Sequence, residues 1–258
     1  IYHDAILYMG QVMAQLRPEV MFDDPFFLHG GQERYSILPW LLGKMALSAT
    51  LPPLFLLGTL ASLFLFAFAS WYALSAMLPT KQRYWAWLGV LLLPSIYGAT
   101  RIFSYNENFL TARPFAEVLC LLAVGSFVRK RWLSGGACIV FAALLHPLQA
   151  LSAGMVMWTW ASIKDRRWLH ALWAAVPVLL LAFADVEPFD GLLHSFDPEW
   201  LAASRTSTHL FIAGWEYTDY TVLFFDAILL AIGSRLLSEP MRRWCFAGLV
   251  GLCMGIGA

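Results

Sequence analysis

The sequence predicts an all-α protein, a polytopic bundle of about seven to eight transmembrane helices with surface helices in an outer loop. Composition is the first reason, because 60% of the 258 residues are hydrophobic and only 13% are charged, whereas soluble domains are about a quarter charged. The second reason is that the apolar residues form blocks long enough to cross a bilayer, which takes about 20 helical residues. The third is that basic residues gather in a few short connectors between these blocks.

Seven apolar blocks define the expected membrane segments. The block 134–163 is interrupted by His146-Pro147. Because proline starts a helix well and disfavours helix in the residue before it, we expect a two-helix hairpin that turns there on the outer side. The alternative, one kinked span, would place two successive basic loops on opposite faces. The blocks cover residues 51–78, 84–100, 108–128, 134–163, 168–184, 221–237 and 244–258.

The basic residues predict which side of the membrane each connector faces. Four short connectors hold 11 of the 17 Lys and Arg residues and only two acidic residues. By the positive-inside rule these connectors face the cytoplasm. Residues 1–50 then form an outer loop, and residues 51–258 form the helix bundle. The four connectors are residues 81–83, 129–131, 164–167 and 235–243.

Several function classes find no support in the sequence. No basic run indicates nucleic-acid binding, and there is no P-loop, no HExxH motif, no zinc-ligand spacing and no Ser-His-Asp order. The four cysteines lie in apolar stretches without a CxxC pair and suit small hydrophobic positions in helices. The sequence begins with Ile and ends within an apolar block, so we expect it to be part of a longer membrane protein.

The first 50 residues combine two amphipathic helices with a polar loop. In "IYHDAILYMGQVMAQLRPEV", Asp4, Tyr8 and Gln11 share one helix face, as expected of a helix lying along the bilayer surface. "SILPWLLGKMALSA" predicts a second short surface helix. The loop between them contains Asp23 and Asp24. Paired carboxylates can hold a divalent cation such as Mg²⁺ or Mn²⁺, but "DDPFF" is equally a turn and helix-cap signal.

In "SYNENFLTARPFAEVL" ionisable side chains lie at the outer start of an apolar block. Glu107 and Arg113 precede the apolar run "PFAEVLCLLAVGSFV", and Glu117 lies within it. Arg113 and Glu117 are four residues apart, so we expect them to pair on one helix face. Such a pair matters because an unpaired charge inside the membrane costs at least about 2 kcal/mol. Arg113 also suits phosphate binding, or an interfacial anchor that extends its charge to the surface.

These segments resemble the GT-C superfamily of membrane glycosyltransferases. In that family an outer loop begins near an acidic residue, and two surface helices and a long span follow. Here Asp4 in "HDAILYMGQ" takes the acidic position, and "LPWLLGKMALSATLPPLFLLGTL" takes that of the surface helix and span. "ENFLTARPFAEVL", "ALLHPLQAL" and "FDPEWLAASRTSTHLFIAGW" look like those of a bacterial GT-C-like subgroup. The resemblance places the family's first span before residue 1.

The resemblance implies an enzyme of the bacterial inner membrane that moves a sugar from a polyprenyl-phosphate donor to an acceptor at the periplasmic face. Such a site needs a carboxylate that accepts the acceptor's proton and donors that hold the phosphate leaving group. Asp4 and Glu107 are the expected catalytic residues, and a helix cap is the alternative role for each. The expected lipid-phosphate or substrate-binding residues are Tyr8, Arg113, His146, Arg205 and His209.

Asp23 and Asp24 remain the candidate metal ligands, for a divalent cation that only some members of the family need. The expected partners are the polyprenyl-phosphate sugar, membrane lipids and other membrane proteins. Two rival functions stay open at this point. A non-catalytic membrane scaffold would keep the same fold. A transporter would need polar residues deep in several helices, whereas Asp226 is the one deep charge in the expected spans.

The topology has a direct test. Cysteines introduced at Gln82 and Ser195, in a chain whose four native cysteines are replaced, should react with a membrane-impermeant thiol reagent from opposite sides. The reason is that Gln82 lies in a basic connector and Ser195 in an acidic one. Modification of both from the same side of intact membrane vesicles would contradict the map.

Overall fold

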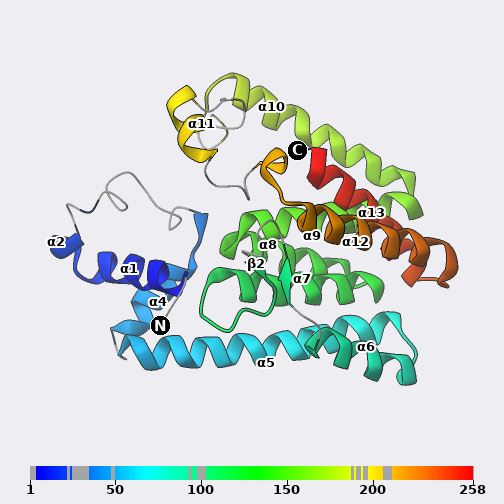
Figure 1. Ribbon diagram of the computed structural model, residues 1–258, viewed down its shortest axis with the longest axis horizontal. Coiled ribbons are helices and arrows are strands. Elements are labelled where there is room, and N and C mark those ends of the chain that lie inside the picture. Colours follow the sequence, from blue (N-terminus) through cyan, green and yellow to red (C-terminus); the bar gives the residue numbers. More distant parts are fainter. Residues whose placement is uncertain are drawn as a thin grey trace. The chain divides into compact units, whose positions relative to one another are not determined.

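The computed structural model is almost entirely helical and confirms the all-α class (Figure 1). The first half of the chain forms α1 (Ala5–Leu16), α2 (Pro18–Met21), α4 (Leu38–Ala46), α5 (Leu51–Met77), α6 (Thr80–Leu92), α7 (Ala112–Val128) and α8 (Trp132–Leu145). The second half forms α9 (Pro147–Lys164), η3 (Arg166–Ala174), α10 (Ala175–Phe183), α11 (Pro198–Ser204), η6 (Ile212–Gly214), α12 (Tyr217–Leu236) and α13 (Met241–Gly257). The residues that the structure describes are 4–21, 24, 35–47, 50–92, 95–97, 103–186, 189, 193, 197–205 and 211–257.

Two helical segments of the described chain are long and apolar enough to cross a membrane, Leu51–Met77 and Arg166–Phe183. The 27 residues of α5 extend roughly 40 Å, more than the hydrocarbon thickness of a bilayer. The other expected spans form shorter or less apolar helices. The block expected at 84–100 differs most, because its helix ends at Leu92 and a two-residue antiparallel pair, β1 (Ile96–Tyr97) with β2 (Phe103–Ser104), follows.

The break predicted at His146 is present. α8 ends at Leu145, and α9 begins at Pro147, where proline has no N–H to lose in the first turn. The chain therefore breaks where predicted, and the expected hairpin stays a prediction.

The chain divides into two compact units. Unit 1 contains residues 1–97 and 103–154, and unit 2 contains residues 98–102 and 155–258. The boundary falls within α9. The expected division at residue 50 concerns the two sides of a membrane rather than compactness, so it stays a prediction.

In unit 1 one buried cluster joins the short N-terminal helices to the long ones. Val12 of α1, Leu42 of α4, Phe55 of α5 and Leu110 before α7 are all nearly inaccessible and belong to the same cluster. Burial of such side chains contributes about 1.5–3 kcal/mol each. The cluster fixes α1 near the start of α7, which positions the polar site described below.

In unit 2 the helix α12 begins earlier than expected, and a stacked pair of tryptophans joins α9 to α13. Glu216 and Asp219 form a reciprocal capping box, so the helix starts at Tyr217 instead of Thr221. Trp160 and Trp244 stack with their ring centroids 5.2 Å apart. Both rings are almost fully buried.

Small residues let α5 and α7 approach each other closely. Ala73 and Gly125 meet where the two helices pack, and a Cβ atom added at Gly125 would lie 2.7 Å from the Tyr72 ring and 3.1 Å from the Ala73 Cα. Arg129 covers the other side of this contact, because its guanidinium lies 4.0 Å from the Tyr72 ring centroid and donates to the Gly125 carbonyl. Small residues serve this purpose in membrane helix pairs.

Gly125→Ala should therefore lower the melting temperature of the detergent-solubilised protein. The added methyl must displace the Tyr72 ring and crowds the Ala73 backbone. Overpacking of this kind costs about 1–3 kcal/mol, more than the roughly 1 kcal/mol that alanine gains in helix propensity. Gly136→Ala in α8 is the matched control, since nothing lies within 4 Å of the added atom. The control should melt at an equal or higher temperature, and equal melting of both variants would contradict the packing described.

Candidate functional site

The polar site begins with the loop that leads into α7. Asn106 adopts a left-handed backbone conformation with a φ of 53°, which Asn tolerates better than most residues. Its backbone N–H donates to Glu117 Oε2 at 2.9 Å. This contact folds the loop back over the first turns of α7 and places Glu107 beside Arg113.

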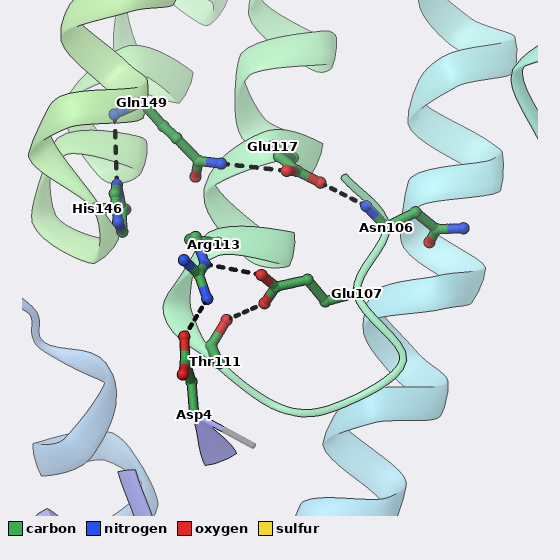
Figure 2. Close-up of polar contacts among 8 residues, drawn as sticks. All are labelled: Asp4, Asn106, Glu107, Thr111, Arg113, Glu117, His146 and Gln149. Atoms are coloured by element: carbon green, nitrogen blue, oxygen red, sulfur yellow. Dashed lines mark hydrogen bonds and ion pairs between the residues drawn. The ribbon is translucent and has the colours of Figure 1, made fainter. Parts of the chain in front are cut away.

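Arg113 bridges two carboxylates that come from distant parts of the sequence (Figure 2). Its Nε lies 2.8 Å from Glu107 Oε1, and its Nη2 lies 2.5 Å from Asp4 Oδ2. Asp4 lies directly before α1, whereas the other two residues lie at the start of α7. One guanidinium therefore joins the N-terminal helix to α7.

The three charged side chains become more exposed in the order Glu107, Arg113 and Asp4. The Glu107 side chain is 1% exposed, that of Arg113 is 13% exposed and that of Asp4 is 38% exposed. Thr111 donates its hydroxyl to Glu107 Oε2 at 2.6 Å, so both oxygens of the buried carboxylate are engaged. Glu107 thus holds the inner side of Arg113, and Asp4 is the member of the chain that solvent or a ligand can reach.

The polar face of α1 turns inward. Tyr8 is 5% exposed and Gln11 is 1% exposed, whereas Ile6 and Leu7 are exposed. Burial raises the pKa of the Tyr8 hydroxyl above its usual range, opposed by a hydrogen bond from the backbone of Ala112. The Gln11 side-chain amide has no hydrogen-bond partner within the described structure. The helix presents apolar side chains outward, as suits contact with lipid.

His146 caps α9 beside this site. Its Nδ1 accepts the Gln149 backbone N–H at 3.4 Å, the geometry of an N-cap. Burial, and secondly the nearby Arg113 guanidinium, lower the pKa of His146 from its usual range. Because Nδ1 accepts this hydrogen bond, the ring proton lies on the second nitrogen, Nε2, which can act as a donor.

The predicted ion pair between Arg113 and Glu117 is wrong. Glu117 instead accepts the Asn106 backbone N–H and, at 3.1 Å, the Gln149 side-chain amide (Figure 2). The loop before α7 places Glu107 against one side of the Arg113 guanidinium, and Asp4 lies against the opposite side. Helical spacing alone permits an i,i+4 pair, but Glu107 from the preceding loop and Asp4 from the distant N-terminal segment pair with Arg113 instead.

Four further residues were expected to bind substrate or a metal ion. Arg205 is exposed at the end of α11 in unit 2, and Asp24 is exposed after α2. Asp23 and His209 lie outside the described residues. Of the side chains that the structure describes, no three of the His, Cys, Asp or Glu type form a group that could hold a metal ion. A cation between Asp4 and Glu107 would also meet the guanidinium, so the described donors do not fit one.

An apolar cavity of about 530 Å³ is lined by residues that are close in sequence to those of the polar site. It lies among α4, α5, α7 and α8, and every lining side chain is apolar. Three of its lining residues are close in sequence to the polar site. Leu110 follows Glu107, Phe115 follows Arg113, and Leu145 directly precedes His146. Sequence patterns alone did not locate it, although the leucines of α4 and α5 recur at helical spacing. The other lining residues are Leu38, Leu41, Leu42, Met45, Leu54, Leu57, Gly58, Ala61, Leu65, Val118 and Leu119.

Arg113→Ala should lower the free energy of unfolding by about 3–5 kcal/mol, because it leaves the Glu107 carboxylate buried without a cation. The double variant Arg113→Ala/Glu107→Gln removes both charges and should recover much of that loss. Asp4→Ala should cost less than about 1 kcal/mol, since its carboxylate is partly exposed. The three values come from denaturant titration in detergent. A double variant no more stable than Arg113→Ala would contradict the buried pair.

No protein-family model, curated protein or solved structure matches this chain.

Proposed function

We propose that the chain is an integral membrane protein that binds a polyprenyl phosphate at Arg113 and transfers the attached sugar to an acceptor on the outer side of a bacterial inner membrane. The observation that carries this proposal is the chain Asp4–Arg113–Glu107 next to a wholly apolar cavity. A phosphate joined to a long hydrocarbon needs both features close together. The resemblance to GT-C glycosyltransferases supports the same function.

The contacts of Arg113 support a phosphate on its exposed side. Asp4 already places an anion against Nη2, and that carboxylate is the more exposed of the two. Exchange of Asp4 for a phosphate would keep an anion on this side, while Glu107 and Thr111 continue to orient the guanidinium. Arginine suits this task because its planar donors match two phosphate oxygens at once. Glu107 is then a positioning residue rather than a catalytic one.

The cavity supports an isoprenoid chain as the second part of the ligand. Its volume of about 530 Å³ holds several isoprene units, and its lining offers no hydrogen-bonding side chain. Leu110 and Phe115 lie on either side of Arg113 in sequence. A chain that enters here would bring its phosphate to the start of α7.

In the transfer step Asp4 acts as the general base. Once released from Arg113, its carboxylate takes the proton of the acceptor hydroxyl as that oxygen attacks the anomeric carbon of the sugar. The bond between this carbon and the phosphate oxygen breaks, and the phosphate leaves with the electron pair. Arg113 stabilises the charge on the departing phosphate, and His146 can donate Nε2–H to it.

The proposal is tested first by binding. The purified protein in detergent should bind an undecaprenyl phosphate probe, measured by native mass spectrometry. Arg113→Lys keeps the charge but loses the two-pronged geometry, so its affinity should fall by roughly tenfold or more. Arg242→Lys is the matched control, because Arg242 pairs with Glu239 in a connector expected on the cytoplasmic side, and it should bind like the unchanged protein. Equal binding by the Arg113 and Arg242 variants would remove Arg113 from the phosphate site.

The second test concerns catalysis. With a panel of undecaprenyl-phosphate sugars in reconstituted vesicles, Asp4→Asn should reduce sugar release by roughly 10²–10⁴-fold, because it removes the general base. The folded state should change little, since this carboxylate is partly exposed. Probe affinity should stay equal or rise, because the phosphate no longer has to displace a carboxylate from Arg113. Full activity of a folded Asp4→Asn variant would make Asp4 only a partner of Arg113. Probe binding without release of any sugar from the panel would favour the non-catalytic scaffold.

A further inference from the structure

A second cavity in unit 1 has a different character from the one beside Arg113. It lies among α5, α6 and α7 and has a volume of about 530 Å³, within the range of small-molecule sites. Of the described residues that line it, Glu117 is the one carboxylate, and none is Lys, Arg or His. The other lining residues are Phe66, Ser70, Ala73, Leu74, Met77, Val90, Tyr105, Cys120, Leu121 and Val124.

Glu117 lacks a cation. Its Oε2 accepts the Asn106 backbone N–H at 2.9 Å, and its Oε1 accepts the Gln149 amide at 3.1 Å. Both donors are neutral, and within the described chain no Lys, Arg or His side chain forms an ion pair with Glu117. The lone pairs left on each oxygen face a largely apolar space. A carboxylate in such surroundings is stabilised by a cation that brings its own hydrogen-bond donors.

Two aromatic rings of the same lining also favour a cation. Phe66 and Tyr105 stack with their ring centroids 5.9 Å apart, and both side chains line the cavity. Ring faces attract ammonium groups, most strongly where water is excluded. Phe66 comes from α5, and Tyr105 lies in the loop before α7, directly before Asn106.

We propose that this cavity binds an amphiphilic amine, a primary ammonium group on a single apolar chain. The ammonium group donates to Glu117 beside the Tyr105 and Phe66 rings, and the chain lies against the apolar residues of α5 and α7. A ligand with an anionic head group would face the Glu117 carboxylate with no cationic side chain among the described lining residues. A plain hydrocarbon would bring no cation to this carboxylate. This site is separate from the lipid-phosphate site and does not depend on the proposed transfer activity.

The test compares three ligands with the same chain: dodecylamine, dodecanol and dodecanoate. Binding is measured by equilibrium dialysis against the protein in a nonionic detergent, with protein-free micelles as the blank. The unchanged protein should bind the amine roughly tenfold or more tightly than the alcohol, and the carboxylate ligand least. Equal affinities for amine and alcohol would overturn the proposal.

Glu117→Gln should abolish the preference for the amine and leave the affinity for the alcohol unchanged. The variant should fold, because the new amide can still accept from Asn106, and the Gln149 side-chain oxygen, which has no partner in the described structure, can turn to accept from it. Asp226→Asn, an exposed carboxylate in α12 outside the cavity, is the matched control and should keep the preference. A Glu117→Gln variant that still prefers the amine would overturn the proposal.

A second variant tests the site without touching Glu117. Val90→Trp on α6 should fill part of the cavity and weaken binding of both the amine and the alcohol. Undecaprenyl phosphate affinity should stay unchanged in this variant, because its cavity is a different one. Amine binding unaffected by Val90→Trp would place the amine elsewhere on the protein and overturn the assignment.

Discussion

The ion pair between Glu107 and Arg113 is the constraint on which the arrangement of unit 1 depends. A carboxylate that is 1% exposed costs several kcal/mol unless a cation and donors surround it. Arg113 supplies the cation, and Thr111 satisfies the second oxygen. Because the guanidinium has donors left over, it also reaches Asp4, and this contact ties the N-terminal helix to α7 across 109 residues of sequence.

The same constraint explains why charged groups lie at the start of an apolar helix. The loop before α7 must turn back to deliver Glu107, and the left-handed Asn106 makes that turn. Its N–H would then be buried, and Glu117 accepts it. The ionisable residues therefore serve two linked purposes: Glu107 and Arg113 form a rigid donor site, and Glu117 fastens the loop that builds it. Rigid support of this kind is what a binding site for an anion needs.

Much of the fold followed from local rules that the sequence displays. The all-α class, the long helix of α5 and the break at His146 depend on apolar composition and on proline, which act over a few residues. Glu107 and Arg113 were identified as candidates because their charges stand out next to an apolar run, and Asp4 because of the resemblance to GT-C enzymes. Their proximity in the structure required long-range packing by Leu110, Val12 and Phe55, which no local pattern specifies.

Taken alone, the sequence determined which residues carry charge and that the chain is helical, whereas the tertiary structure decided which charges meet. The spacing predicted an ion pair between Arg113 and Glu117. In the folded structure the Arg113 guanidinium instead forms ion pairs with the Glu107 and Asp4 carboxylates. Likewise, the periodicity of α1 showed a polar face but not that Tyr8 and Gln11 turn inward. The physical reason is that an i,i+4 contact contributes only about 0.2–0.5 kcal/mol, while a buried unpaired carboxylate costs several.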